Sequence, residues 1–179
     1  MRNFLLRVDA STGTVTRNQV LRKVAGMEFG TIEREMHIDA APEVVFDVVS
    51  NPEHVRQWWP DEAEYEAVPG GRGRIAFGDP SADGGWVQFT VVDAVPYRLF
   101  SFRWTHEEGE QAAQGNSFLV VFELEPSGSG TRLRMTESGF RERGWDEAKV
   151  AAQHAEHVAG WDFFLSRLPT YATKVGAAR

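Results

Sequence analysis

The chain has 179 residues, a length typical of one domain that can bury a core without disulfide bonds or metal ions. Its 26 acidic residues against 19 basic residues give a net charge of −7, which argues against the dense basic surface that nucleic-acid binding needs. It contains no cysteine, which excludes disulfide bonds, catalytic thiolates and cysteine-ligated metal sites.

The beginning of the chain differs from the rest. Apolar residues alternate briefly at Phe4, Leu6 and Val8, and a short helix is expected over 17–24. Because these signals are separate from the regular pattern that starts later, residues 1–30 are expected to form an N-terminal arm or an extension. The regular pattern begins at Thr31, and a single domain is expected over residues 31–175.

One strand and two short helices are expected next. Apolar and polar residues alternate over 32–38, as in a half-buried strand. Pro42 and Glu43 suit the first turn of a helix over 42–49, because this turn tolerates a missing N–H and its positive end favours a carboxylate. A shorter helix is expected over 53–57.

The middle of the chain reads as a series of strands separated by turns rich in glycine and proline. The alternation and the turn residues favour antiparallel hairpins. The expected strands cover residues 74–77, 86–93, 97–105, 118–125 and 131–137.

A long amphipathic helix follows the strands. Apolar residues, together with His154 and His157, recur at helical spacing from Val150 to Leu168. Pro169 should end or kink this helix. Strands in series with helices kept apart from them are typical of an α+β fold. We expect a curved sheet whose concave face is closed by the long helix.

Aromatic residues are the unusual part of the composition, with 12 Phe, 6 Trp and 3 Tyr. Because side chains alternate along a strand, parity places many of these rings on the face toward the long helix. Two uses stay open, a solid aromatic core and an incompletely filled cavity that binds a ligand. The candidate lining residues are Trp58, Trp59, Phe77, Trp86, Phe89, Phe102, Trp104, Phe118, Phe122, Met135 and Trp161.

Glu137 shares the inward parity of its strand, and a buried carboxylate needs partners. His154 and His157 lie on the apolar face of the long helix and can approach it. A buried Glu–His pair would be a candidate acid–base site. The alternative is that Glu137 lies at the open end of the sheet while the histidines make structural hydrogen bonds. All three residues join the candidate ligand-binding set, and no catalytic residue is assigned.

Neither a metal nor a cofactor is expected. His154 and His157 have the spacing of two helical metal ligands but lack an evident third. The glycine-rich stretch 70–73 precedes a strand and not a helix, so it fits a tight turn better than a phosphate-binding loop.

Four segments carry a family resemblance: REMHIDAAPEVVFDVVSNPEHVRQWWP (34–60), VPGGRGRIAF (68–77), RLRMTESGF (132–140) and HVAGWDFFLSRL (157–168). In this order they resemble the START-like (Bet v 1-like, SRPBCC) superfamily, and most closely its branch named for the activator of heat-shock protein 90 ATPase homologue. The resemblance implies a helix-grip fold, in which a curved antiparallel sheet wraps around a long C-terminal helix and two short helices follow the first strand. It also implies a hydrophobic cavity.

We therefore expect a small hydrophobic or aromatic ligand to bind between the sheet and the C-terminal helix. One alternative is a polyketide cyclase- or dehydratase-like enzyme that uses Glu137 with His154 or His157. Another is a chaperone-associated or other protein-interaction module. Whether the protein is an enzyme, and whether it forms a homodimer, stays open.

The expected location is the cytoplasm, and the expected partners include neither nucleic acid nor a membrane. No apolar run reaches the roughly 18 residues of a transmembrane helix. Residues 1–15 lack the long apolar core and the small-residue cleavage site of a signal peptide.

Overall fold

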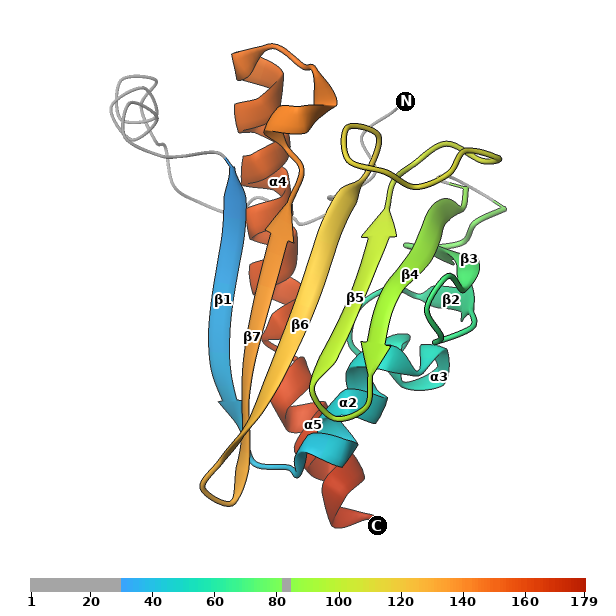
Figure 1. Cartoon of the computed structure of the whole chain (residues 1–179). Helices are drawn as coiled ribbons and strands as arrows, with labels where there is room; N and C mark the ends of the chain where they lie inside the picture. The colour runs from blue at the N-terminus through green and yellow to red at the C-terminus, as the bar shows by residue number, and fades with distance from the viewer. Residues whose placement is uncertain (1–29, 82–84) are drawn as a thin grey trace.

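Seven antiparallel strands form one sheet in the computed structural model, which describes residues 30–81 and 85–179. The order is β1-β7-β6-β5-β4-β3-β2, so consecutive strands pair from β2 to β7 and β1 lies beside β7 at one edge (Figure 1). The strands are β1 (Thr31–Ile38), β2 (Glu62–Tyr65), β3 (Arg72–Ala76), β4 (Val87–Val95), β5 (Leu99–Trp104), β6 (Phe118–Ser127) and β7 (Gly130–Ser138).

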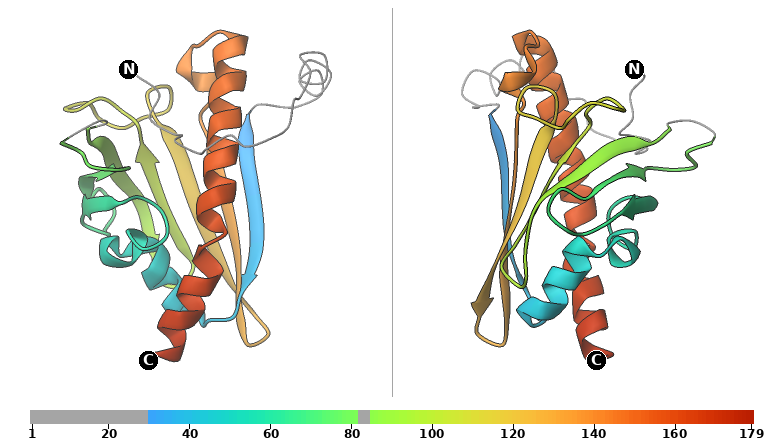
Figure 2. Two further views of the ribbon diagram at one scale, coloured as in Figure 1. Left: turned by 180° about the vertical axis from the view of Figure 1, so that it is seen from behind. Right: turned by 45° about the vertical axis from the view of Figure 1, so that its right-hand side comes forward.

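One long helix crosses the concave face of this sheet, as the two views of Figure 2 show. Two short helices follow β1, and a further helix continues from the long one. The helices are α2 (Pro42–Ser50), α3 (Pro52–Val55), α4 (Glu147–Leu165) and α5 (Leu168–Ala177), with a 3₁₀ turn, η1 (Arg141–Arg143), before α4. The α+β class and the helix-grip arrangement expected from the sequence are confirmed.

Local sequence explains where the helices begin. The Asn51 side chain accepts a hydrogen bond from the backbone N–H of Glu53 at 3.0 Å and caps α3. Asp146 caps α4 in the same way, through the N–H of Lys149 at 2.8 Å. The break expected near Pro169 is present, but the chain resumes as α5, because proline is tolerated in the first turn of a helix as well as after its end.

The glycine turn before β3 is also confirmed. The N–H of Gly71 donates to the carbonyl oxygen of Val68 at 2.8 Å, and Gly70 has φ +81°. A proline followed by a residue with positive φ is the pattern of a type II turn, in which Pro69 and Gly70 take the two central positions.

Burial confirms the strand parity. Phe100, Phe102 and Trp104 of β5 are buried, and in β7 Met135 and Glu137 have no exposed surface. Side chains of this parity form the core beneath α4. The sheet therefore brings its aromatic rings and one carboxylate to the helix-covered face.

The structure bears on two further expectations to different extents. The N-terminal arm, residues 1–30, lies outside the described residues apart from Gly30. Within the described ranges, no helix combines the length and the apolar character that a membrane crossing requires.

Candidate functional site

A completely buried carboxylate lies between the sheet and α4. Glu137 has no exposed surface, and three ring nitrogens surround it. Trp104 Nε1 donates to Oε1 at 2.8 Å, and Trp161 Nε1 donates to Oε2 at 2.7 Å. His157 Nδ1 lies 2.9 Å from Oε2. These contacts join β5, β7 and α4 at one point.

This set of donors suits an ionised carboxylate. An indole N–H can only donate, so both oxygens of Glu137 act as acceptors. With its proton on Nδ1, His157 supplies a third donor, and hydrogen bonds to a charged acceptor are stronger than neutral ones. Without such partners a buried carboxylate would cost several kcal/mol, so the three contacts explain how Glu137 is tolerated in the core.

His157 is held in one orientation. Its ring packs against Phe118, Phe140 and Trp104, with centroid distances of 4.6, 5.2 and 5.3 Å. Glu137 fixes Nδ1, which leaves Nε2 as the nitrogen able to interact with another molecule. A histidine oriented by a carboxylate is an arrangement that can transfer protons.

His154 lies one turn earlier on α4 and is also buried. Its Nε2 is 3.5 Å from the carbonyl oxygen of Thr31 on β1, and its ring meets Phe140 at 5.1 Å. Burial lowers the pKa of His154, and the Thr31 carbonyl and the Glu137 carboxylate oppose this effect. His154 therefore contacts the edge strand, whereas His157 contacts Glu137 directly.

Trp59, in the connection between α3 and β2, is a central member of the ring cluster. Its ring stacks on Trp161 with centroids 5.1 Å apart. It also contacts Phe102 at 5.3 Å, Trp104 at 5.4 Å and Phe77 at 6.0 Å. The rings therefore fill most of the concave space by packing on one another.

A small pocket remains beside α4, partly open to solvent. Its volume of about 10 Å³ has room for about one water molecule. His157 supplies a titratable group in a wall that otherwise consists of aromatic rings and one glycine. The pocket is lined by Trp59, Trp104, His157, Gly160, Trp161 and Phe164.

Several predicted residues are buried away from this pocket. Trp58 donates its indole N–H to the carbonyl oxygen of Val48 at 3.0 Å, so it anchors α2. Phe89 stacks on Phe102 at 4.3 Å within the core. The remaining predicted core residues that do not line the pocket are Phe118, Phe122 and Met135, all buried, and Phe77, partly buried beside Trp59.

Trp86 lies apart from the other predicted rings. It precedes β4 and has the parity of Gln88, opposite to that of the buried Phe89. The guanidinium of the exposed Arg74 lies 4.1 Å from the centroid of its ring. Its parity and this cation–π contact place Trp86 outside the concave ring cluster.

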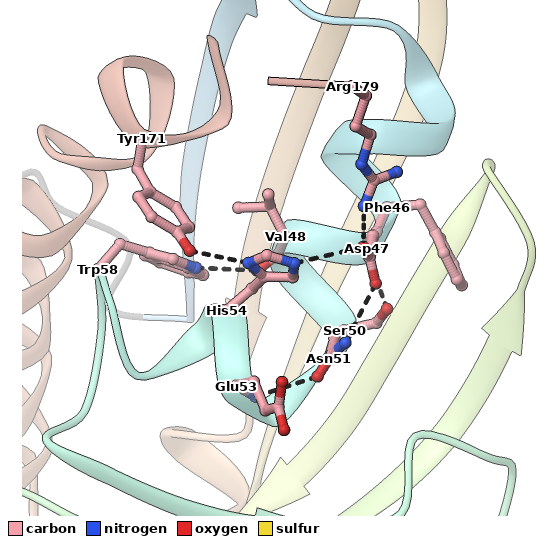
Figure 3. Close-up of polar contacts among 10 residues, drawn as sticks. All are labelled: Phe46, Asp47, Val48, Ser50, Asn51, Glu53, His54, Trp58, Tyr171 and Arg179. Atoms are coloured by element: carbon pink, nitrogen blue, oxygen red, sulfur yellow. Dashed lines mark hydrogen bonds and ion pairs between the residues drawn. The ribbon is translucent and has the colours of Figure 1, made fainter. Parts of the chain in front are cut away.

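A second polar cluster, absent from the sequence analysis, joins α5 to α2 and α3. Figure 3 shows His54 between Tyr171 and Asp47, with its Nδ1 2.8 Å from the Tyr171 hydroxyl and its Nε2 3.4 Å from Asp47 Oδ2. Arg179 also pairs with Asp47. Burial, with a smaller contribution from Asp47, raises the pKa of Tyr171, so its hydroxyl stays protonated and can donate to His54. This cluster fastens the C-terminal helix.

The site does not resemble a metal centre. Two indole N–H groups and the Nδ1 of His157 already contact the oxygens of Glu137. In the part of the chain that the structure describes, no group of three or more histidine, aspartate and glutamate side chains could hold a metal ion.

Replacing Glu137 by glutamine should cost about 3–5 kcal/mol of unfolding free energy, because a charged acceptor is lost and the new amide N–H₂ opposes an existing donor. Urea denaturation measures the difference. Glu123→Gln is the matched control on β6, where an exposed carboxylate lies 3.7 Å from Arg134, and it should cost about 1 kcal/mol or less. Equal costs for the two variants would contradict the assigned role of Glu137.

Acid should destabilise the fold partly through His154. Because its pKa is below the ordinary 6.5, the unfolded chain binds the proton more readily, and stability falls as the pH drops below about 6.5 toward the folded-state pKa. His154→Gln can still donate to Thr31 but does not titrate. The variant should lose less unfolding free energy than the unmodified protein between about pH 7.5 and pH 5. The same loss in both proteins, measured by urea denaturation, would argue against this assignment.

Solved structures share this fold. Protein MLL2253 from Mesorhizobium loti is 23% identical with a TM-score of 0.63, covering 80% of this chain and 97% of that chain. The Aha1 dimer from Colwellia psychrerythraea is 22% identical with a TM-score of 0.58, covering 78% and 92%. DynU16, described as a putative protein in the dynemicin biosynthetic locus, is 23% identical with a TM-score of 0.61, covering 84% and 49%. At these identities the similarity shows the fold alone.

Sequence comparison supplies the family. None of the curated proteins matches the chain. The profile of the family described as Activator of Hsp90 ATPase homolog 1-like protein matches residues 39–173, about three quarters of the sequence. The resemblance seen in the four sequence segments is thus confirmed, and the chain belongs to the Activator of Hsp90 ATPase homolog 1-like family.

Proposed function

We propose that the protein binds a small, flat, mainly apolar molecule with a hydroxyl group in the pocket beside α4. The observation that carries the proposal is the position of His157, which lines the pocket while Glu137 holds its Nδ1. Ligand sites in proteins are commonly apolar cavities with a few fixed polar groups, and this is the composition of the pocket wall.

We infer that the ligand carries a hydroxyl group from the hydrogen-bonding state of His157. When Nδ1 donates to Glu137, a neutral ring has a lone pair on Nε2. A phenolic hydroxyl is a donor of suitable size, and its ring can pack against Trp59 and Trp161. The buried carboxylate thus serves binding indirectly, by orienting the histidine.

The ligand must displace side chains, because the pocket as it stands holds about one water molecule. Phe164 is the lining side chain best suited to move. It is only partly buried, and its ring neighbours are Phe77 at 5.6 Å and the exposed Phe163 at 5.1 Å. Rotation of Phe164 would widen the pocket without breaking a hydrogen bond to Glu137.

The proposal predicts that 4-ethylphenol binds more tightly than ethylbenzene, which has the same ring and alkyl group but no hydroxyl. One net hydrogen bond of about 0.5–1.5 kcal/mol corresponds to a preference of roughly 2- to 10-fold. Ligand-observed NMR titration in sealed tubes measures both affinities.

His157→Asn is the matched variant for this titration. Its amide can still donate to Glu137 but places no atom at the position of Nε2, so the preference for the phenol should disappear while ethylbenzene binds as before. If neither compound binds the unmodified protein at about 1 mM, the proposed function is wrong.

A second candidate function is acid–base catalysis on the bound molecule, as in a polyketide cyclase- or dehydratase-like enzyme. The Glu137–His157 pair favours it, because a carboxylate that orients a histidine can support proton removal at Nε2. DynU16, a fold neighbour, is described as a putative protein in a biosynthetic locus, which is compatible with a role in small-molecule synthesis.

Deuterium exchange tests this second candidate. Acetophenone in deuterated water exchanges its methyl hydrogens when a base removes them, and NMR follows the loss of their signal. An enzyme of this kind should accelerate exchange by about 100-fold or more over buffer, and His157→Asn should abolish the acceleration. Exchange at the buffer rate with the unmodified protein would count against catalysis by His157.

A homodimer and a chaperone-associated role stay predictions for this chain. The Colwellia psychrerythraea protein is described as a dimer, and the family description names an activator of the Hsp90 ATPase. Both statements concern those proteins, and the ligand proposal depends on neither.

A further inference from the structure

Gly160 occupies a position in α4 that has no structural need for glycine. A glycine in the interior of a helix weakens it relative to alanine. At some other glycines of the described chain a close backbone contact leaves no room for a side chain: a Cβ at Gly73 would lie 2.0 Å from the Glu64 carbonyl oxygen, and one at Gly130 would lie 2.2 Å from that of Ile38. At others, such as Gly70 with φ +81°, the backbone itself favours glycine. A Cβ at Gly160 would meet no atom within 4 Å, and its φ is not positive.

The position of Gly160 suggests what the missing side chain provides. His157 and Phe164 lie three residues before and four residues after it, so the three share one face of α4. All three line the pocket. Gly160 is partly exposed to solvent, whereas His157 and Trp161 are buried. The open space at Gly160 therefore connects His157 with the surface.

We propose that Gly160 is the portal of the pocket and sets the width of molecule that can reach His157. This inference rests on the proposed ligand-binding function. A flat phenolic ring would pass over the bare helix backbone at Gly160, between the solvent and a pocket wall that also contains Trp161 and Phe164. The glycine is then retained for access, at the expense of helix stability.

Two substitutions separate access from stability. Gly160→Ala should raise the Tm by about 2–4 °C, since alanine favours the helix and its Cβ meets open space. Gly160→Leu should fold as well but fill the portal, so the association rate and affinity for 4-ethylphenol should fall by about tenfold or more. Ala159→Leu, at an exposed neighbouring position of α4, is the control and should bind at the unmodified rate.

The outcomes distinguish the two proposals. If the unmodified protein fails to bind 4-ethylphenol, the proposed function fails. If it binds, and Gly160→Leu binds at the same rate and affinity, the portal is wrong and the proposed function stands. A lower Tm for Gly160→Ala would also overturn the portal, because glycine would then be required by the fold. Stopped-flow tryptophan fluorescence gives the rates, and thermal unfolding gives the Tm values.

Discussion

A fully buried carboxylate needs hydrogen-bond donors to its oxygens, and much of this structure follows from which side chains supply them to Glu137. Its strand places it in the core, and its partners come from β5 and α4 through Trp104, Trp161 and His157. Each partner also brings a large ring, so the same contacts that compensate the charge pack the helix against the sheet. The crossing of α4 over the sheet is thus defined by directional hydrogen bonds as well as by apolar burial.

The many aromatic residues have two roles around this carboxylate. Trp59 packs on Trp161 and Trp104, two of the residues that hold Glu137, so the rings cover the carboxylate and exclude water from it. The remaining pocket is small and lies next to His157. A solid core and a ligand site are therefore not exclusive here: most rings form the core, and a few of them, with His157 and Gly160, form the wall that a ligand would contact.

Backbone periodicity accounts for what the sequence could predict. Strand parity correctly placed Phe102, Trp104 and Glu137 inward, and helical spacing placed His157 on the buried face of α4. Which histidine reaches Glu137 could not be predicted, since His154 and His157 share that face and the choice depends on where the helix crosses the sheet. Trp86 precedes β4 with the parity of the solvent-facing side chains, and among the described residues it contacts the exposed Arg74 and not the other rings of the predicted set. The Tyr171–His54 contact was missed because Pro169 can start a helix as well as end one.

The most direct test of this account is the hydrogen-exchange rate of the indole N–H groups of Trp104 and Trp161, followed by NMR. If Glu137 holds both groups at the centre of the fold, each N–H should exchange only when the whole domain unfolds, with a protection free energy equal to the global free energy of unfolding. Exchange of either indole N–H at a rate close to that of the unfolded chain would contradict the central role of the buried carboxylate.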